Sequence, residues 1–200
     1  EPTTFKYGLL NTITPPEDGS TTDSSQAQNF GWSNKISEPG LLSGRSTATK
    51  YLFVGAPGYS SDTGQVYMYE WGIGSDGSTY DTWTQNLTIT SGDPGQGKRF
   101  GHRLEANDNG DILAVSSLSP GQAGKVEIFT RSSQANDGST DHAFTLRQTL
   151  TGISADGSSL NTAFGDSIAM TKDGTTLIIG APGVDDGSTG QIDGGPIYYY

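Results

Sequence analysis

The segments LFVGAPG (residues 52–58) and LIIGAPG (residues 177–183) are nearly identical, although they lie far apart in the chain. Each begins with an apolar run that is typical of a strand buried on both faces. Each ends in Gly-Ala-Pro-Gly, where proline stops the strand because it cannot donate a hydrogen bond to the sheet. Between them, ILAVSSLS (residues 112–119) has a similar apolar run but ends in Ser-Ser-Leu-Ser. The three segments therefore predict one strand that recurs in three copies of a repeat.

Three further features recur around this strand. A Phe-Gly pair precedes it, a third strand follows it, and a fourth strand closes the unit. The Phe-Gly pairs are Phe30-Gly31, Phe100-Gly101 and Phe164-Gly165, the third strands are expected at 65–71, 125–131 and 196–200, and the fourth strands at 82–90 and 144–152, with a related segment at 5–14. In the middle copy, Val126 and Ile128 should face one side of the third strand and Glu127 the other. The repeat is therefore a unit of four strands.

Tight turns are expected between these strands. Asn109-Gly110 and Asp173-Gly174 lie between the first and second strands of their units, and such pairs tolerate the positive φ angles of tight hairpins. No segment has the pattern of a helix longer than one turn. The sequence therefore predicts an all-β protein.

The repeat also predicts how its copies are arranged. Short-stranded units of about 65 residues cannot bury both faces alone, so neighbouring units must stack and share a core. Four-stranded antiparallel units around an axis are the blades of a β-propeller, which usually has roughly 4 to 8 blades. We expect about three blades here, as part of a larger propeller in a longer polypeptide; a different stacked β array is the alternative. The expected divisions are an outer strand of a preceding blade at 1–15, a first blade at 16–90, a second blade at 91–152, and a third blade at 153–200 that lacks its fourth strand.

The recurring residues have structural interpretations. Glycine and alanine at the end of the second strand suit a place where blades converge and large side chains do not fit. The Phe of each Phe-Gly pair would fill the gap between adjacent blades, while its Gly would allow the backbones to approach closely. We interpret these residues as packing positions rather than as ligand contacts.

A Phe-Gly pair, an apolar strand, Gly-Ala-Pro and an aromatic strand together resemble the FG-GAP repeat of integrin α-subunit propellers. The closest copy runs from Phe164-Gly165 through LIIGAPG, whereas a longer loop separates Phe30-Gly31 from LFVGAPG and the copy at Phe100-Gly101 keeps only the first half. The resemblance covers the chain from Phe30 onward. It implies a propeller fold but no single function, because such repeats occur in adhesion receptors, bacterial surface proteins, some secreted lipases and virion proteins of marine bacteriophages.

The same resemblance implies a calcium site. Integrin-type blades often carry a calcium loop between the first and second strands, where Asp and Asn side chains contribute to the roughly six to eight oxygens that Ca²⁺ prefers. The matching turn is ANDNGDIL (residues 106–113), in which the candidate ligands are Asn107, Asp108, Asn109 and Asp111. This loop is short, and the matching turns of the other two copies contain fewer acids, which departs from the integrin pattern. No other cofactor is expected.

Composition excludes several classes of function. The chain has 22 Asp and Glu residues against 11 Lys and Arg and a net charge of −11, which would repel a nucleic acid backbone. No apolar run approaches the roughly 18 residues of a membrane helix, so we expect no membrane insertion. The chain has no cysteine, and its two histidines, His102 and His142, lie in no metal-binding or nucleophile motif. We expect no enzyme activity.

The resemblance and the composition lead to one main hypothesis about function. We expect a noncatalytic structural or adhesion module at an extracellular or virion surface, as in a phage fibre or tail-associated protein. Its partners would be a protein or glycan surface ligand, or neighbouring virion subunits. The alternatives are a cellular integrin-like or bacterial surface adhesion protein, and the propeller domain of a secreted hydrolase whose active site lies elsewhere.

Overall fold

The computed structural model describes residues 12–16, 29–40, 49–71, 82–119, 123–131, 143–152, 162–183 and 195–200. Within these residues the chain forms eleven strands and one single-turn helix, α1 (Tyr59–Asp62), which confirms the all-β prediction. None of the helices in this part of the chain is long and apolar enough to cross a membrane.

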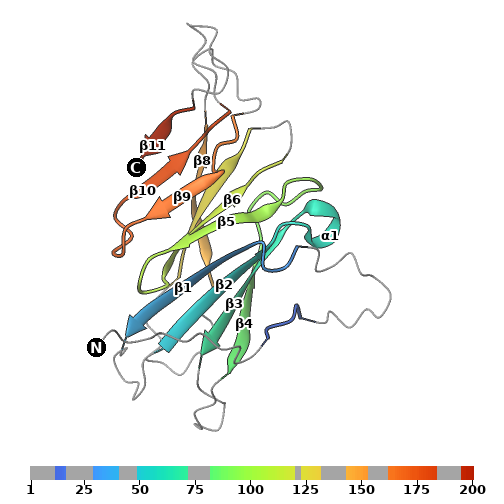
Figure 1. The fold of residues 1–200 in the computed structure, drawn as a ribbon, viewed down its shortest axis with the longest axis vertical. Coiled ribbons are helices and arrows are strands. Elements are labelled where there is room, and N and C mark those ends of the chain that lie inside the picture. Colours follow the sequence, from blue (N-terminus) through green and yellow to red (C-terminus); the bar gives the residue numbers. More distant parts are fainter. Residues whose placement is uncertain are drawn as a thin grey trace, which may run out of the picture.

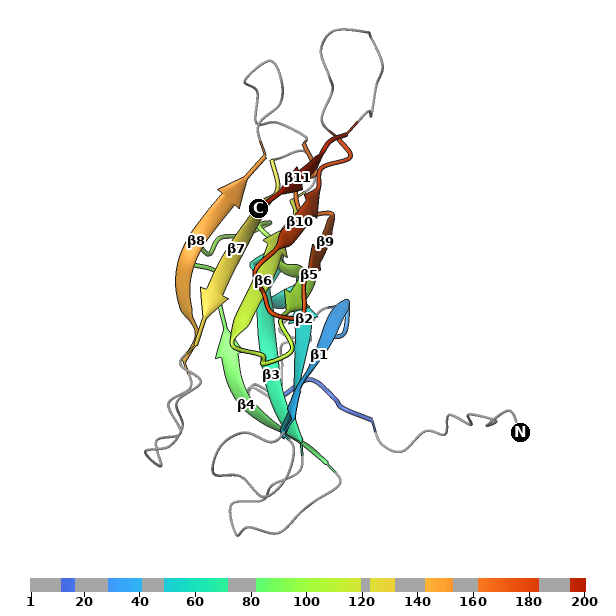
Figure 2. The ribbon, with the colours of Figure 1, turned by 90° about the vertical axis from the view of Figure 1, so that its left-hand side faces the viewer.

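The strands form three antiparallel sheets, in which neighbours along the chain are neighbours in the sheet. The first sheet contains β1 (Ser33–Gly40), β2 (Thr49–Ala56), β3 (Gln65–Trp71) and β4 (Trp83–Ile89). The second contains β5 (Phe100–Ala106), β6 (Ile112–Ser117), β7 (Lys125–Thr130) and β8 (Thr145–Thr151), which lie side by side in Figure 2. The third contains β9 (Ser167–Met170), β10 (Leu177–Gly180) and β11 (Ile197–Tyr199).

The three sheets follow one another in chain order, as Figure 1 shows. The first strands of the sheets lie close together, because β5 contacts both β1 and β9. Polar contacts join them: the Lys35 ammonium is 2.6 Å from the Glu105 carboxylate, and the Ser33 hydroxyl donates to the Gly101 carbonyl at 2.7 Å. The sheets are therefore linked along the edge formed by their first strands.

Strand pairing places the recurring segments in the same register. Gly55 in β2 pairs with Val66 in β3, and Gly180 in β10 pairs with Ile197 in β11. In the second sheet, Ser116 pairs with Val126. The serine segment thus occupies the position of Gly-Ala-Pro in the other two sheets.

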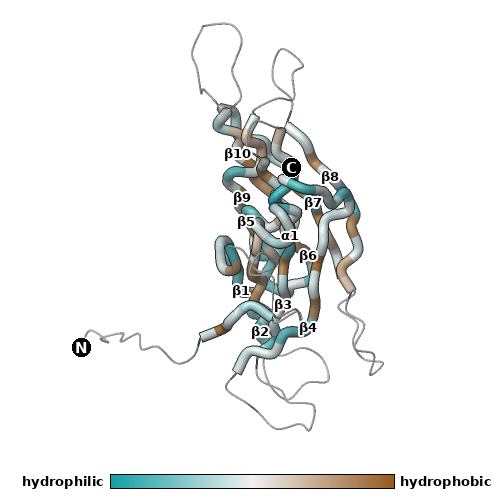
Figure 3. The backbone as a smooth tube through the Cα atoms, turned by 90° about the vertical axis from the view of Figure 1, so that its right-hand side faces the viewer, coloured by the Kyte–Doolittle hydropathy of each residue, from teal (hydrophilic) through white to brown (hydrophobic). Residues whose placement is uncertain are grey.

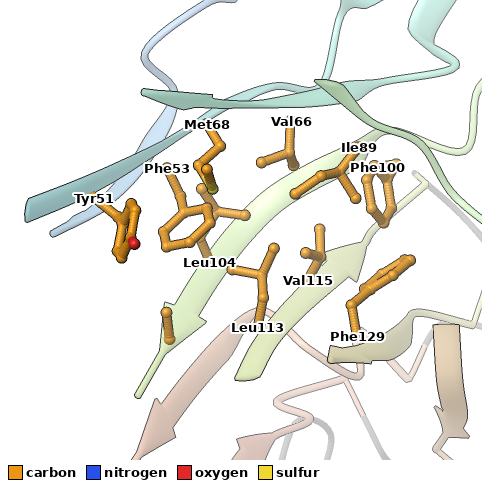
Figure 4. Close-up of a cluster of buried hydrophobic side chains, with 11 residues drawn as sticks. Tyr51, Phe53, Val66, Met68, Ile89, Phe100, Leu104, Leu113, Val115 and Phe129 are labelled. Carbon is orange, nitrogen blue, oxygen red and sulfur yellow. The ribbon is translucent and has the colours of Figure 1, made fainter. Parts of the chain in front are cut away.

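Apolar side chains fill the space between successive sheets. The cluster between the first and second sheets, shown in Figure 4, consists of Tyr51, Phe53, Val66, Met68, Ile89, Phe100, Leu104, Ala106, Leu113, Val115 and Phe129. A second cluster between the second and third sheets contains Phe164 with Ala114, Val126, Leu150, Leu177, Ile179 and Ala181. In Figure 3 the hydrophobic residues are accordingly concentrated in the strands. Phe100 and Phe164 are both fully buried between sheets, as the sequence predicted for the Phe-Gly pairs.

Burial follows the strand order within each sheet. The second strands β2 and β6 are almost entirely buried, as predicted, because a layer of the protein covers each of their faces. Strand β10 differs, since Ile178 is 40% exposed on the face that no described sheet covers. Most residues of β4 and β8 are exposed or half-buried, so the fourth strands lie toward the outside.

The predicted close approaches at glycine are present. A β carbon on Gly55 would collide with the Gly101 carbonyl oxygen and the Ser33 hydroxyl, and one on Gly180 would collide with the Ser167 hydroxyl. Glycine therefore ends these second strands because a first strand passes against its backbone.

The predicted hairpin turns are present at Gly110 and Gly174. Gly110 and Gly174 have φ angles of +64° and +75° in the hairpins that join β5 to β6 and β9 to β10, as predicted. The strand expected at 5–14 lies largely outside the described residues. Ile13, within 12–16, packs against a third apolar cluster on the first sheet, which contains Val54, Ala56, Tyr67 and Tyr69.

Candidate functional site

One end of the stacked sheets carries most of the recurring sequence features. There the first strands begin after their Phe-Gly pairs and the second strands end, since Ser33 pairs with Gly55 and Ser167 with Gly180. We call this the Phe-Gly end. The hairpins at Gly110 and Gly174 lie at the opposite end of the strands.

A pocket of about 270 Å³ opens at the Phe-Gly end of the second sheet. It is lined by Lys98, Ser117, Ser119, Ala123, Gly124, Lys125 and Thr151. We call it the lysine pocket. None of the described residues that line it is acidic.

The walls of the lysine pocket come from the connection before β5 and from β6, β7 and β8, the last of which contributes Thr151. Ser117 ends β6 and Lys125 begins β7, and the two residues pair across the sheet. Lys98 comes from the connection between β4 and β5. This connection is held to the first sheet, because the N–H of Arg99 donates to the Asp62 carbonyl at 2.7 Å and that of Phe100 donates to the Thr63 carbonyl at 3.2 Å.

The Ser117 hydroxyl is an unusual feature of the pocket wall. Ser117 is only 3% exposed, and its hydroxyl has no hydrogen-bond partner among the residues that the structure describes. Buried polar groups in proteins nearly always have a partner, and leaving one without a partner is destabilising. The pocket wall therefore contains a buried polar group that lacks a hydrogen-bond partner among the described residues.

The Lys125 ammonium is held in place by a buried acidic residue. Glu127 is 1% exposed, and its carboxylate accepts hydrogen bonds from the Ser91 hydroxyl at 2.7 Å and from the Gly92 N–H at 3.0 Å. The Lys125 ammonium lies 3.3 Å from this carboxylate and donates to the Ser91 hydroxyl at 3.0 Å. A buried charge is stable only when it is paired and hydrogen-bonded, so this network fixes the ammonium beside the pocket.

A second carboxylate lies near both lysines, outside the pocket wall. Asp93 is 3.8 Å from the Lys98 ammonium and 3.9 Å from the Lys125 ammonium. These distances exceed those of hydrogen bonds, and the Asp93 side chain is 75% exposed. Asp93 therefore balances the two lysines only weakly, since water screens its charge.

A row of side chains from the first strands also lies near the Phe-Gly end. The ring of His102 lies 5.7 Å from the exposed ring of Trp32. Arg103 reaches the third sheet, where its guanidinium donates to the Asp166 carbonyl at 2.8 Å. Burial lowers the pKa of His102, and Arg103 lowers it further, while Asp166 acts in the opposite direction. His102 is thus a neutral, packed side chain near pH 7.

The predicted calcium ligands lie at the opposite end, in the hairpin between β5 and β6. The Asn107 amide oxygen accepts hydrogen bonds from the N–H groups of Asp111 and Ile112, at 3.1 and 3.0 Å, and its NH₂ group donates to the Asp111 carboxylate at 2.6 Å. Asp108 faces Lys172, with 3.8 Å between the carboxylate and the ammonium, and Asn109 is exposed in the turn.

This hairpin uses the Asn107 amide oxygen and one Asp111 carboxylate oxygen in hydrogen bonds of its own. Asn107 could not turn its amide oxygen to a cation without losing two hydrogen bonds that close the turn. The described residues contain no group of three His, Cys, Asp or Glu side chains that could hold a metal ion. The arrangement therefore does not fit a bound Ca²⁺ as it stands, and calcium at Asn107, Asp108, Asn109 and Asp111 stays a prediction of the resemblance.

Sequence reasoning did not identify the lysine pocket. Ser117 belongs to the segment that replaces Gly-Ala-Pro, and Lys98 and Lys125 lie far apart in the chain. The one available signal was the change from Gly-Ala-Pro to Ser-Ser-Leu-Ser, which places hydroxyl groups where the other copies have none.

No protein-family model and no curated protein matches this chain. The assignment of a function therefore depends on the sequence pattern and on the geometry of the sheets and the pocket.

Proposed function

We propose that the three sheets are blades of a larger β-propeller of the FG-GAP type. We further propose that the protein is a noncatalytic structural or adhesion module of a virion surface, such as a phage fibre or tail-associated protein. Its partners would be a protein or glycan on the host surface, or neighbouring virion subunits.

The observation that carries the proposal is that both interfaces between sheets are built in the same way. Phe100 at the first interface and Phe164 at the second are fully buried at equivalent places. The first strands lie together, as expected of strands near the axis of a propeller. Repetition of one stacking step, with first strands gathered on one side, is the geometry that a radial array of blades requires.

The uncovered face of the third sheet supports a continuation of the array. Ile197 and Tyr199 are 74% and 76% exposed. Their register equivalents in the first sheet, Val66 and Met68, are fully buried beneath the second sheet. The third sheet thus has the same kind of apolar face that the first sheet uses to stack, which fits a further blade.

The charged groups of the first strands serve the scaffold rather than chemistry. Lys35 and Glu105 join the first two sheets, and Arg103 and Asp166 join the second and third. These contacts support a rigid module that acts by binding, with loops presented at the ends of the blades.

Electron microscopy of the full-length polypeptide, together with gold-labelled antibodies against this chain, tests the proposal. We expect images of a closed ring of blades and labelling of virus particles. An open sandwich in place of a ring would contradict the propeller. Labelling of cells and not of particles would contradict the virion assignment and favour a cellular adhesion protein.

A further inference from the structure

We infer that the lysine pocket binds the oxyanion group, a carboxylate or phosphate, of a ligand about the size of a monosaccharide. The residues that line the pocket are the reason to expect an oxyanion. That the oxyanion belongs to a sugar rests on the proposed function, in which surface glycans are among the partners.

The basic residues in the walls of the pocket favour an oxyanion. Two lysines, Lys98 and Lys125, line the pocket together with hydroxyl residues, and none of the described residues that line it is acidic. This is notable in a chain with 22 acidic and 11 basic residues. Hydrogen bonds between an ammonium and an oxyanion are about twice as strong as neutral ones, so these walls favour an anion over a neutral or cationic group.

The buried hydroxyl of Ser117 also favours an oxyanion. It is a free hydrogen-bonding group among the described residues, and it lies in the same wall as Lys125. An oxygen of a bound oxyanion that reaches Ser117 would accept a hydrogen bond from its hydroxyl and supply the partner that it lacks. Because the hydroxyl is already desolvated, this hydrogen bond adds affinity without a further loss of hydration.

The ammonium group of Lys125 is fixed, whereas that of Lys98 is nearly free. Lys125 is held by Ser91 and Glu127, whereas the only ion pair of Lys98 in the described residues is the loose one with Asp93. A ligand oxyanion between the two ammonium groups would take over the balancing role of Asp93. Asp93 therefore competes with the ligand, and its removal should strengthen binding.

The size of the pocket limits the ligand. A volume of about 270 Å³ is larger than a single small ion needs and lies just below the roughly 300–1,000 Å³ of sites for drug-sized molecules. Ser119 and Thr151 add hydroxyl groups to the walls. The Ser119 hydroxyl donates to the Gly97 carbonyl, so its oxygen can still accept a hydrogen bond from a sugar hydroxyl.

Calorimetric titration and amide NMR shifts with three probes test the inference: glucuronate, glucose 6-phosphate and glucose. We expect one or both charged sugars to bind and to shift the amide signals of residues 117 and 124–125, while glucose does not bind. Lys98→Met and Ser117→Ala should each weaken binding about tenfold, because each removes one hydrogen bond to a charged group. Asp93→Asn should strengthen it, and Lys172→Met, which removes a lysine exposed at the opposite end, should leave it unchanged.

Several results would overturn the inference. These are binding of glucose as tight as that of the charged sugars, no binding of any probe, or binding that Lys98→Met and Ser117→Ala leave unchanged. The comparison of glucuronate with glucose 6-phosphate identifies which oxyanion the pocket prefers. Failure here is distinct from failure of the proposed function, because particle labelling and blade images do not depend on the pocket, and a bound charged sugar does not depend on a virion.

Discussion

Gly64 and Phe100 form a parallel bridge that joins the first sheet to the first residue of β5. A β carbon on Gly64 would collide with the nitrogen and oxygen of the Phe100 backbone. The same relationship recurs at the next interface, where a β carbon on Gly124 would collide with the Phe164 backbone. The Phe-Gly pairs of the second and third sheets are therefore each positioned by a glycine that precedes the third strand of the sheet before it.

Gly64→Ala should destabilise the protein, because the new β carbon forces the two sheets apart. Both Gly64 and Gly97 have positive φ angles, +84° and +74°, but a β carbon on Gly97 would meet nothing within 4 Å. Gly97→Ala therefore carries only the conformational strain, about 1–2 kcal/mol, while Gly64→Ala adds about 1–3 kcal/mol of overpacking. Urea unfolding of both variants measures the difference, and equal losses would show that the sheets do not approach as described.

Glu127→Ala should lower the free energy of unfolding by about 3–5 kcal/mol, because it leaves the poorly exposed Lys125 ammonium without its closest carboxylate and creates a cavity. It also leaves the Ser91 hydroxyl and the Gly92 N–H without their acceptor. The matched control is Glu38→Ala, since Glu38 lies 3.0 Å from the Lys50 ammonium but its side chain is 60% exposed. That exposed pair should contribute about 0–1 kcal/mol.

Denaturant unfolding of the two glutamate variants measures both losses. Similar small losses in Glu127→Ala and Glu38→Ala would mean that Glu127 is reached by water and that the Lys125 ammonium is not fixed by it.

The sequence predicted strands and hairpin turns because these depend on local patterns. The apolar runs before Gly55 and Gly180 identify buried strands, and Asn109-Gly110 and Asp173-Gly174 identify hairpins, since each signal lies within a few residues. Glu127 shows the limit of this reasoning. Alternation places it opposite Val126 and Ile128, on a face that could be wet, yet it is buried because Ser91 and Gly92, distant in the chain, supply its partners.

The lysine pocket could not be predicted for a similar reason. Its walls come from the connection before β5, the end of β6, the start of β7 and the end of β8, and none of these segments alone has a binding motif. Lys98 and Lys125 meet only because the bridge at Phe100 holds that connection against the sheet. The candidate calcium loop shows the opposite case, in which a local motif was visible but the amide oxygen of Asn107 is used by the hairpin itself.

Phe164→Ala should lower the free energy of unfolding by about 3–5 kcal/mol, as expected for loss of a fully buried aromatic side chain. Its ring packs edge to face against Tyr198, 5.2 Å away, within the second apolar interface. Phe30 is half-buried, so Phe30→Ala should lose less, under about 2 kcal/mol. Thermal unfolding of the two variants measures this order, and a larger loss at Phe30 would contradict it.

Acidification should destabilise the protein in part through His102. Because burial lowers its pKa from a usual value of 6.5, the unfolded chain binds a proton at a higher pH than the folded protein does. The free energy of unfolding should therefore fall as the pH drops below 6.5, and this contribution should level off once the pH is below the pKa of His102 in the folded protein. Urea unfolding at several pH values, from about 8 to about 5, measures it.

The control for this titration is His102→Asn, in which the part of the pH dependence due to His102 should be missing. His142→Asn removes the other histidine of the chain and isolates the His102 signal in proton NMR titrations. A His102 signal that titrates at or above 6.5 would contradict the lowered pKa.

Val66 and Ile197 occupy equivalent positions, yet only Val66 is covered by another sheet, so truncating the two should have very different effects. Val66→Ala should lower the free energy of unfolding by about 2 kcal/mol, from two buried methyl groups and the space they leave. Ile197→Ala should change it by less than about 0.5 kcal/mol in this chain, because its side chain is 74% exposed. In a longer polypeptide that adds a blade to the third sheet, the loss at Ile197 should rise toward that at Val66. Urea unfolding of both variants in both lengths of chain measures this, and a loss at Ile197 that stays small in the longer polypeptide would contradict stacking on that face.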